Sequence, residues 1–324
     1  MKALITGAAG MIGTSLSRRL LERGDQVRGL LMPDEPDRGL GARGLEIVRG
    51  DVTRPETLAG IADGCDQVFH LAARVQEWGR RSQFRQTHYE GTTNMLRECA
   101  GKIDRFIYFS SIAYYGTNPM LGLTEDFEPT FSGLPYPDMK MLCEGLIRTY
   151  AAERGLRYTM LRPANVICTR SAHLVNVIDS FLKGLVPLVD GGSYNASFVY
   201  VENLVDGVLL AADSDKAVNR AYAFVDDYTV TWRDYLMGVG ALLGKKPAFS
   251  VSFRQAYALA AVVEYLFMPF NVRPPFTRYA VTLLGQENHV DASRAREELG
   301  WKTRVPWEEV WSEIEEYVRK EFPV

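Results

Sequence analysis

The sequence predicts an α/β fold, with a doubly wound parallel sheet followed by a smaller, mixed C-terminal domain. Up to about residue 165, short continuous apolar runs alternate with amphipathic segments at regular spacing. This alternation is typical of βαβ units, in which helices cover both faces of a parallel sheet. A glycine-rich turn follows the first apolar run, and the regular alternation ends after Pro163. We therefore expect a first domain built around the sheet and a second domain of mixed structure.

The expected strands cover residues 2–6, 26–31, 45–51, 67–73, 105–111 and 158–163, and the amphipathic segments between them include residues 14–24, 56–64 and 92–101. A later apolar run at residues 197–201 predicts a further strand. Apolar residues from Trp307 to Val318 recur at helical spacing after Pro306, so we expect a final helix whose tryptophans serve packing.

Composition narrows the class of protein. With 324 residues, 47% of them hydrophobic and 24% charged, the chain is typical of a globular protein. A net charge of -3 provides no basic surface to hold nucleic acid or an anionic bilayer. The cysteines lie far apart without metal-ligand spacing, so we expect reduced thiols, no metal site and a cytoplasmic location. No apolar run reaches the ~18 residues that span a bilayer, and the chain begins directly with a strand, so we expect a soluble protein without a signal peptide.

The stretch "LITGAAGMIGTSL" carries the first functional signal. It sets Gly7, Gly10 and Gly13 at three-residue intervals between a strand and an amphipathic helix. In this context the glycines allow a tight turn, close approach of a pyrophosphate and close helix packing, while the helix N-terminus favours negative charge. We therefore interpret the loop as a dinucleotide-binding turn of a Rossmann-type domain rather than a purely structural turn.

Further positions fit the same dinucleotide. Asp51 follows the third strand, where its carboxylate can accept from an adenine amino group, although an exposed loop aspartate is the alternative. At the end of the second strand, Leu31 and Met32 stand where an acidic residue would indicate NAD and an arginine NADP. Asp34 or Arg38 can reach in from the loop, so we expect NAD or NADP, with a slight preference for NAD. The predicted cofactor contacts are Gly7, Gly10, Met11, Ile12, Gly13, Asp51, Val52, Leu71, Ala72, Ala73, Tyr136, Lys140 and Pro163.

A Tyr-x-x-x-Lys pair supplies the candidate catalytic group. Tyr136 and Lys140 project from one face of a helix, and Ser111 ends a strand 25 residues before Tyr136. A phenol with a pKa near 10 is a poor acid or base at neutral pH unless a nearby cation lowers that pKa, which Lys140 can do. Ser111 can polarise a substrate oxygen. Pro137 restricts Tyr136 away from helical geometry, which places Tyr136 at the start of the helix.

These motifs together resemble the extended short-chain dehydrogenases/reductases, of the NAD-dependent epimerase/dehydratase superfamily. The family's TGxxGxxG matches residues 6–13, its SSxxxYG residues 110–116 and its YxxxK residues 136–140. The resemblance runs nearly end to end and implies Ser111, Tyr136 and Lys140 as the catalytic triad, and a homodimer. It implies a Rossmann domain at residues 1–165 with a return segment at about 195–212, and a substrate-binding domain at residues 166–194 and 213–324.

Within this superfamily the chain resembles the 3β-hydroxysteroid dehydrogenase-like branch, over residues 68–96, 161–166, 197–212, 221–236 and 272–301. Sugar-nucleotide epimerases and dehydratases carry an Arg-Asp pair before the strand at 198–201, where this chain has Ala196 and Ser197, so a diphosphate would be held poorly. The family often has Asn where this chain has His88, and three interpretations are open: a neutral imidazole substitutes for the asparagine, the residue marks a changed proton path, or it is a plain helix histidine.

The resulting hypothesis is an NAD(P)-dependent oxidoreductase that interconverts a secondary alcohol and a ketone on a small hydrophobic substrate, steroid-like or a β-keto lipid. A nucleotide-sugar epimerase or dehydratase is the enzyme alternative, and an NAD(P)-sensing regulator without catalysis is the other. The apolar tract from Gln255 to Phe276 has three alternative interpretations. It roofs a substrate pocket, it rests on a membrane surface as a peripheral contact, or it is a buried helix of the second domain.

Overall fold

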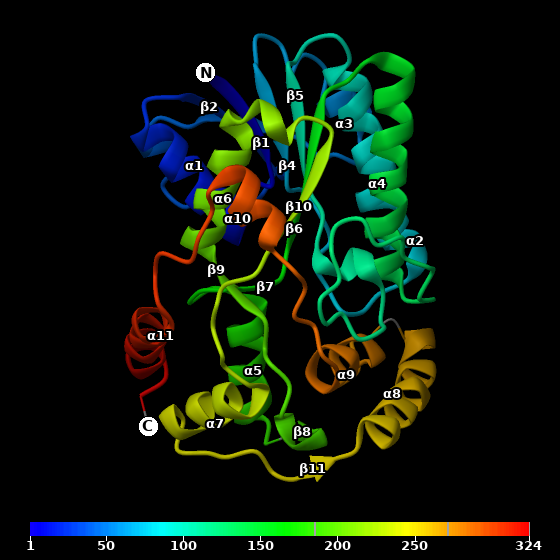
Figure 1. Ribbon diagram of the computed structural model, residues 1–324, viewed down its shortest axis with the longest axis vertical. Coiled ribbons are helices and arrows are strands. Elements are labelled where there is room, and N and C mark those ends of the chain that lie inside the picture. Colours follow the sequence, from blue (N-terminus) through cyan, green and yellow to red (C-terminus); the bar gives the residue numbers. More distant parts are fainter. Residues whose placement is uncertain (185, 271, 324) are drawn as a thin grey trace.

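A parallel sheet runs through the upper half of the molecule in Figure 1, a computed structural model that describes residues 1–184, 186–270 and 272–323. Within these residues the sheet has seven strands in the order β10-β6-β5-β4-β1-β2-β3, and every neighbouring pair is parallel. The strands are β1 (Lys2–Thr6), β2 (Gln26–Leu31), β3 (Glu46–Arg49), β4 (Gln67–His70), β5 (Arg105–Phe109), β6 (Tyr158–Pro163) and β10 (Arg220–Phe224). This sheet confirms the predicted fold class.

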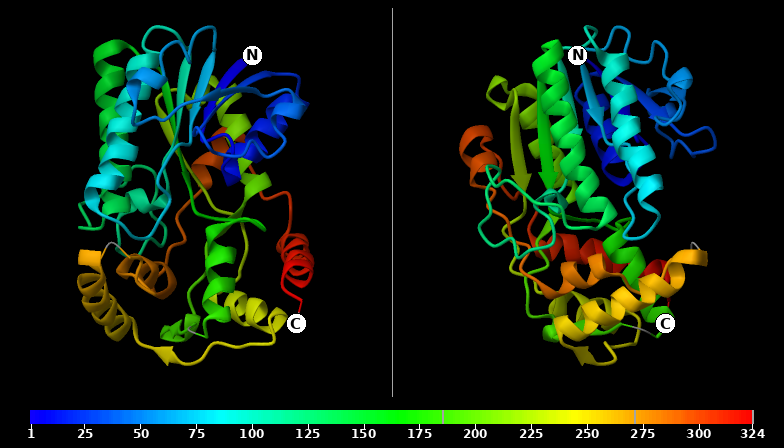
Figure 2. Two further views of the ribbon diagram at one scale, coloured as in Figure 1. Left: turned by 180° about the vertical axis from the view of Figure 1, so that it is seen from behind. Right: turned by 90° about the vertical axis from the view of Figure 1, so that its right-hand side faces the viewer.

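Helices cover both faces of the sheet (Figure 2). On one face lie α1 (Met11–Glu22) and α6 (Val201–Asp213); on the other lie α3 (Gly91–Cys99) and α4 (Pro135–Arg154). The side chains of β1 show why its run is continuously apolar: Ala3 and Ile5 pack into the core under α1, whereas Leu4 packs into the core under α3 and α4. A strand buried on both faces cannot alternate between apolar and polar residues.

One expected helix is absent. Residues 56–64, which the amphipathic pattern favoured as a helix, form a 3₁₀ turn at Pro55–Thr57 followed by further turns. Gly60 and Gly64 have φ angles of 75° and 70°, which no right-handed helix contains. Leu58 and Ile61 are nevertheless buried in the core under α3, so the apolar spacing reflects packing of a turn.

The boundary expected at residue 213 needs a correction. The predicted return segment contains β9 (Phe198–Tyr200) and most of α6, and α6 packs on α1. However, β10 lies beyond residue 213 and pairs with β6 along its whole length, so it belongs to the sheet of the first domain. Its run of only five residues gave no periodic signal that tied it to the sheet. The remaining division into two domains stays a prediction.

The lower half of Figure 1 holds the second part of the molecule. It contains α5 (Ala172–Leu182), α7 (Trp232–Leu242), α8 (Phe253–Phe267) and α9 (Arg278–Gly285), with β8 (Leu188–Val189) paired to β11 (Ser250–Val251). β7 (Asn165–Ile167) pairs with β9, and α10 (Ser293–Leu299) packs on β10 and α6. None of the described helices is long and apolar enough to cross a membrane.

The predicted C-terminal helix is present as α11 (Trp307–Glu321), with Pro306 at its N-cap. Its tryptophans serve packing, as expected. Trp307 stacks face to face on Phe198 with ring centroids 5.6 Å apart, and Trp311 packs against Tyr235 of α7. The helix therefore holds the second part against the segment that returns to the sheet.

Candidate active site

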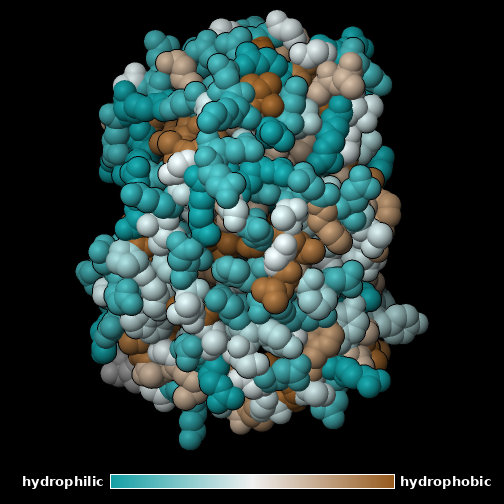
Figure 3. Space-filling model, viewed as in Figure 1, coloured by the Kyte–Doolittle hydropathy of each residue, from teal (hydrophilic) through white to brown (hydrophobic). Residues whose placement is uncertain are grey.

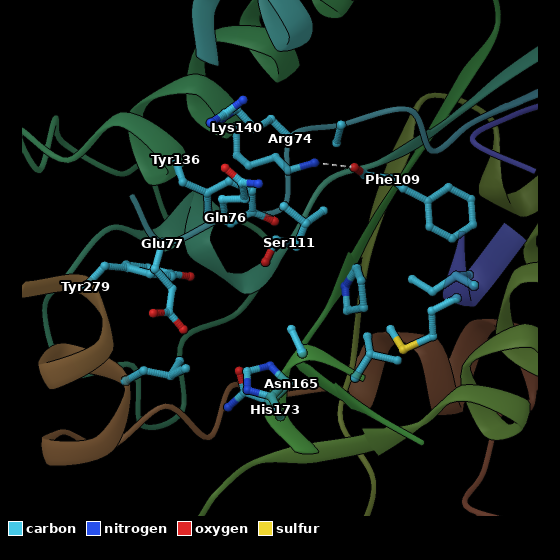
Figure 4. A pocket seen from close by; sticks show the side chains of 18 of the residues that line it. Arg74, Gln76, Glu77, Phe109, Ser111, Tyr136, Lys140, Asn165, His173 and Tyr279 are labelled. Carbon is cyan, nitrogen blue, oxygen red and sulfur yellow. Dashed lines mark hydrogen bonds between the residues drawn. The ribbon is translucent and has the colours of Figure 1, made fainter. Parts of the chain in front are cut away.

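A cavity of about 550 Å³ lies where β1, β4, β5 and β6 end, facing α5 and α9 (Figure 4). The strand order reverses between β4 and β1, and in open parallel sheets such a switch point is where ligands bind. Several of the predicted site residues line this cavity: Met11, Ile12, Leu71, Ala73, Ser111, Tyr136, Lys140 and Pro163. The predicted residues Gly7, Gly10, Gly13, Asp51, Val52 and Ala72 lie outside its lining.

The glycine loop has the geometry that a dinucleotide requires. Gly7 has a φ of 67°, and a Cβ on Gly13 would stand 2.2 Å from the carbonyl oxygen of Gly7. Gly10 is the N-cap of α1, has no capping side chain, and is followed by a first turn without an acidic residue. The first backbone N–H groups of the helix are therefore available to an anion. The loop fits the diphosphate of NAD or NADP.

The loop after β4 is fixed by a buried hydrogen-bond network. The Thr6 hydroxyl accepts from the backbone N–H groups of Leu71 and Ala72 at 3.1 and 3.0 Å, and it lies 2.9 Å from Nδ1 of His70. The other ring nitrogen of His70 lies 3.1 Å from the Thr92 hydroxyl. Burial lowers the pKa of His70 to about 3, so the ring is neutral. Sequence reasoning missed the roles of Thr6 and His70 because neither acts on a ligand: Thr6 holds the backbone of the loop, and His70 bonds the Thr6 and Thr92 hydroxyls.

The residues predicted for the adenosine end of the cofactor lie in the loops after β2 and β3. Asp51 accepts from the backbone N–H of Thr53 at 2.8 Å through one carboxylate oxygen. Arg38 is exposed, and its Nε donates to the Ala9 carbonyl of the glycine loop at 2.9 Å. Of the two loop residues considered for the ribose, Arg38 is thus the one that reaches the glycine loop, while Asp34 is exposed.

Helix α4 carries Tyr136 and Lys140 to one side of the cavity. The helix begins at Pro135 after the N-cap Leu134, so Tyr136 lies inside the first turn rather than before it. Proline is tolerated there because the first N–H groups have no partner inside the helix. The restriction expected from Pro137 does not push Tyr136 out of the helix; the chain bends away from helical geometry at Leu134 instead, with a ψ of 137°.

Lys140 is almost fully buried, and its Nζ donates to the Phe109 carbonyl at 2.7 Å (Figure 4). The ammonium lies 5.6 Å from the ring centroid of Tyr136. Burial lowers the pKa of Lys140 to about 8. Burial also raises the pKa of Tyr136 to about 12, and the Ser111 hydroxyl opposes that rise. In this structure the phenol is therefore protonated at neutral pH, and the Ser111 hydroxyl counteracts part of the effect of its burial.

Ser111 stands at the N-cap of the 3₁₀ turn Ile112–Tyr115, where its Oγ accepts from the Ala113 N–H at 3.1 Å. This bond fixes the Ser111 side chain toward the cavity, on the same side as Tyr136 (Figure 4). The neighbouring Ser110 also lines the cavity, and its buried Oγ has no hydrogen-bond partner among the described residues. Such a hydroxyl is available to a bound ligand.

Aromatic rings hold Tyr136 from two sides. His88 meets it edge-on with ring centroids 5.7 Å apart, and Tyr279 of α9 does so at 5.8 Å. His88 lies in the π-helical turn Arg85–Glu90, and its Nε2 lies 3.2 Å from the Arg74 carbonyl. Burial, with a smaller contribution from Lys140, lowers the pKa of His88 to about 3. A neutral ring bonded to the backbone supports the plain structural interpretation of His88 over a proton path.

The far wall of the cavity brings in polar residues that no motif indicated. Asn165 and His173 lie opposite Ser111 and Tyr136 (Figure 4). Arg273, beyond α8, pairs with Glu77 of the loop after β4 at 3.0 Å and so joins the two halves of the wall. These residues come from β7, α5 and two loops that lie far apart in sequence, so only the fold brings them together. The cavity is mixed in character rather than uniformly apolar.

Known proteins agree with this fold and geometry. The model of the NAD dependent epimerase/dehydratase family matches residues 3–224. A 2-alkyl-3-oxoalkanoate reductase of Stenotrophomonas maltophilia is 29% identical over 322 residues, which cover 95% of this chain and 97% of that protein. A 3-beta-hydroxysteroid dehydrogenase of Mycolicibacterium neoaurum is 27% identical, with 98% and 91% covered. The UDP-glucose 4-epimerase of Thermotoga maritima, solved with UDP-glucose, superposes with a TM-score of 0.78 at 24% identity over 99% of both chains, which supports the fold.

The glycine loop, the Tyr136 and Lys140 pair and the match over most of the sheet domain all point to one family. The chain belongs to the NAD-dependent epimerase/dehydratase family of extended short-chain dehydrogenases/reductases, in the 3β-hydroxysteroid dehydrogenase-like branch, and is an oxidoreductase that uses NAD or NADP.

Proposed function

We propose that this enzyme interconverts a secondary alcohol and a ketone on a hydrophobic substrate, through Ser111, Tyr136 and Lys140. The observation that carries the proposal is the buried phenol of Tyr136. Its pKa of about 12 keeps it protonated at neutral pH, directly beside a serine hydroxyl that faces the same cavity. A protonated phenol next to a second donor is suited to give a proton to a carbonyl oxygen as that oxygen gains negative charge.

Each residue has a separate task in the proposed reduction. Tyr136 donates its proton to the substrate oxygen, and Ser111 donates a hydrogen bond to the same oxygen. NAD or NADP, which the glycine loop and Lys140 would hold, would supply the hydride for the carbonyl carbon or accept it in the reverse direction. Lys140, held by the Phe109 carbonyl, places a positive charge near the phenol and binds the nicotinamide ribose. In the alcohol-oxidising direction that charge favours loss of the phenol proton.

The substrate class rests on the relatives and on two residues of this sequence. The two relatives named above act on a 2-alkyl-3-oxoalkanoate and on a 3β-hydroxysteroid, both with a large hydrocarbon part. Ala196 and Ser197 offer no cation at the place where sugar-nucleotide enzymes hold a diphosphate. These points favour a steroid-like or β-keto lipid substrate over a nucleotide sugar. The proposal includes the homodimer that the family resemblance implies.

A substrate panel tests the proposal. Oxidation of NADH and NADPH is followed with 2-alkyl-3-oxoalkanoates, and reduction of NAD and NADP with 3β-hydroxysteroids. We expect turnover with at least one of these classes and no measurable heat of binding for UDP or dTDP in calorimetry. Tight UDP binding without net redox turnover would favour the epimerase or dehydratase alternative. Cofactor binding without turnover on any alcohol or ketone would favour the regulator.

A further inference from the structure

The loop between β4 and α2 (Arg81–Phe84) brings two hydrogen-bond donors to the cavity without partners. Arg74 and Trp78 of this loop both line the cavity. Nε of Arg74 and Nε1 of Trp78 are buried, and neither has a hydrogen-bond partner among the described residues. Guanidinium and indole nitrogens donate hydrogen bonds but cannot accept them. What these two side chains lack is therefore an acceptor.

Arg74 also carries a charge that the cavity wall does not balance. Three cationic side chains line the cavity, and two of them have polar partners. Lys140 donates to the Phe109 carbonyl at 2.7 Å, and Arg273 pairs with Glu77 at 3.0 Å. Arg74 makes no ion pair within the part of the chain that the structure describes; its guanidinium instead lies 5.7 Å from the Phe84 ring centroid. A half-buried cation without a partner suits an anionic ligand.

Arg74 lies on the side of the cavity where the candidate proton donor stands. Its carbonyl oxygen lies 3.2 Å from Nε2 of His88, and the His88 ring meets the Tyr136 ring edge-on at 5.7 Å. Figure 4 shows Arg74 on the same side of the cavity as Lys140. A ligand group bound by Arg74 would therefore belong to a molecule whose other end can reach Tyr136.

Two other negative groups do not supply the missing acceptor. Glu77 of the same loop pairs with Arg273, and Figure 4 shows it toward Tyr279 rather than toward Arg74. The diphosphate of the cofactor fits the glycine loop before α1, on one face of the sheet. Helix α2, against which the Arg74 guanidinium lies, packs on α4 at the opposite face. The acceptor is therefore expected from the substrate.

The remainder of the cavity suits a hydrocarbon chain. Apolar side chains from three separate segments line it, among them Leu71, Val166 and Leu283. Figure 3 shows hydrophobic side chains at mid-height of the molecule, where the sheet ends, on a face that is otherwise mainly hydrophilic. An amphiphilic substrate with one anionic group matches both parts of the wall.

We propose that Arg74 and Trp78 bind a carboxylate of the substrate, so that the enzyme prefers an alcohol or ketone with a carboxylate to an uncharged one. A carboxylate accepts hydrogen bonds from several donors at once, and arginine can hold it with two parallel bonds. The inference rests on the proposed function, because it assigns the second polar group of the same substrate. Of the two substrate classes proposed above, it selects an acid of the β-keto lipid class over an uncharged steroid.

A matched pair of substrates tests the assignment. Oxidation of 2-hexyl-3-hydroxydecanoate and of its methyl ester is measured with NAD or NADP, because the ester keeps the alcohol and the chains but has no charge. We expect wild-type kcat/KM to be at least about tenfold higher for the acid. Arg74→Gln should lower kcat/KM for the acid by about 10- to 100-fold, mainly through KM, and leave the value for the ester within about threefold.

Three controls separate recognition of the carboxylate from other roles. Arg74→Lys keeps the charge and should recover part of the preference for the acid. Trp78→Phe removes only the indole N–H, and should cost about three- to tenfold for the acid alone. Arg85→Gln removes a guanidinium that pairs with Glu90 outside the lining of the cavity, and should change neither substrate. NADH and NADPH should bind to Arg74→Gln within about threefold of wild type.

The results that would overturn the carboxylate site differ from those that would overturn the proposed function. Equal losses for acid and ester in Arg74→Gln, or wild-type enzyme that oxidises the ester as well as the acid, would remove the site and leave the function standing. Weaker cofactor binding as the sole effect would assign Arg74 to the cofactor. If neither compound turns over, calorimetry with the NADH-saturated protein decides: tighter binding of the acid that is lost in Arg74→Gln supports the site, and equal or absent binding overturns it.

Discussion

Glu144 and Arg162 form a buried ion pair behind the candidate active site. Breaking this pair should lower the free energy of unfolding substantially. Arg162 of β6 donates through Nε and Nη2 to the two carboxylate oxygens of Glu144 at 2.8 and 2.7 Å, and both side chains are fully buried. Glu144 lies one turn after Lys140 on α4. The pair therefore anchors the helix that carries Tyr136 and Lys140 to the sheet.

Glu144→Gln leaves the Arg162 guanidinium buried without a counter-charge. Breaking a buried pair in this way costs about 3–5 kcal/mol of the free energy of unfolding. The guanidinium would keep its bonds to the Tyr115 hydroxyl and the Glu125 carbonyl, at 3.2 and 3.0 Å, which points to the lower end of that range. Urea unfolding, followed by circular dichroism, measures this loss. A lower midpoint with an unchanged m-value would show that the stability alone has changed.

Two further variants decide how the loss is interpreted. Glu153→Gln, on the exposed end of the same helix, should change the free energy of unfolding by less than about 0.5 kcal/mol. Glu144→Leu/Arg162→Met removes both charges and should recover much of the stability, because desolvation of a lone charge is then avoided. A loss below about 1 kcal/mol in Glu144→Gln would refute the reasoning.

Two other predictions concern acid stability and cofactor choice. Burial lowers the pKa of His70 and His88 to about 3, so their contribution is fully present above pH 6.5 and is lost as the pH falls toward 3. Protonation of each histidine in the unfolded state should cost about 2 kcal/mol in the free energy of unfolding between pH 6.5 and pH 5. His88→Asn should remove half of this pH dependence. If urea unfolding shows the same change of the free energy with pH in His88→Asn and wild type, the prediction is contradicted. Arg38→Ala should weaken NADP by at least about tenfold and NAD little in fluorescence titrations, since Arg38 reaches the glycine loop. Equal weakening of both would show that Arg38 does not face the 2′-phosphate.

Local signals predicted the sheet domain well. The strands are continuously apolar because both faces of the sheet are buried. The glycine loop is recognisable because its turn needs a positive φ and a close approach that only glycine allows. The segment at 56–64 misled because apolar spacing alone does not separate a buried turn from a helix, although Gly60 and Gly64 were signals against a helix. Strand β10 was missed because it is a run of only five residues and lies after Pro163, where the regular alternation that identified the other strands ends.

The residues of the candidate site likewise fall into those that a motif predicts and those that only the fold brings together. Ser111, Tyr136 and Lys140 are found by motif because a fixed spacing on one strand end and one helix suffices to place them. Thr6 holds the backbone of the loop after β4, and His70 bonds the Thr6 and Thr92 hydroxyls. The Arg273 and Glu77 pair joins segments almost 200 residues apart. None of these contacts has a spacing that reasoning from sequence can use. Their roles follow from the fold alone.

The most direct test of the central claim is turnover by Tyr136→Phe, measured with a substrate from the panel and a nicotinamide cofactor deuterated at the transferred position. The account predicts that kcat falls by about 10²–10⁴, the range that a positioned proton donor supplies, while cofactor binding stays within about threefold. Tyr150→Phe, on the same helix and outside the cavity, should keep wild-type turnover with deuterium found in the alcohol. Near-normal kcat in Tyr136→Phe, with deuterium still transferred, would contradict the assignment of Tyr136 as the proton donor.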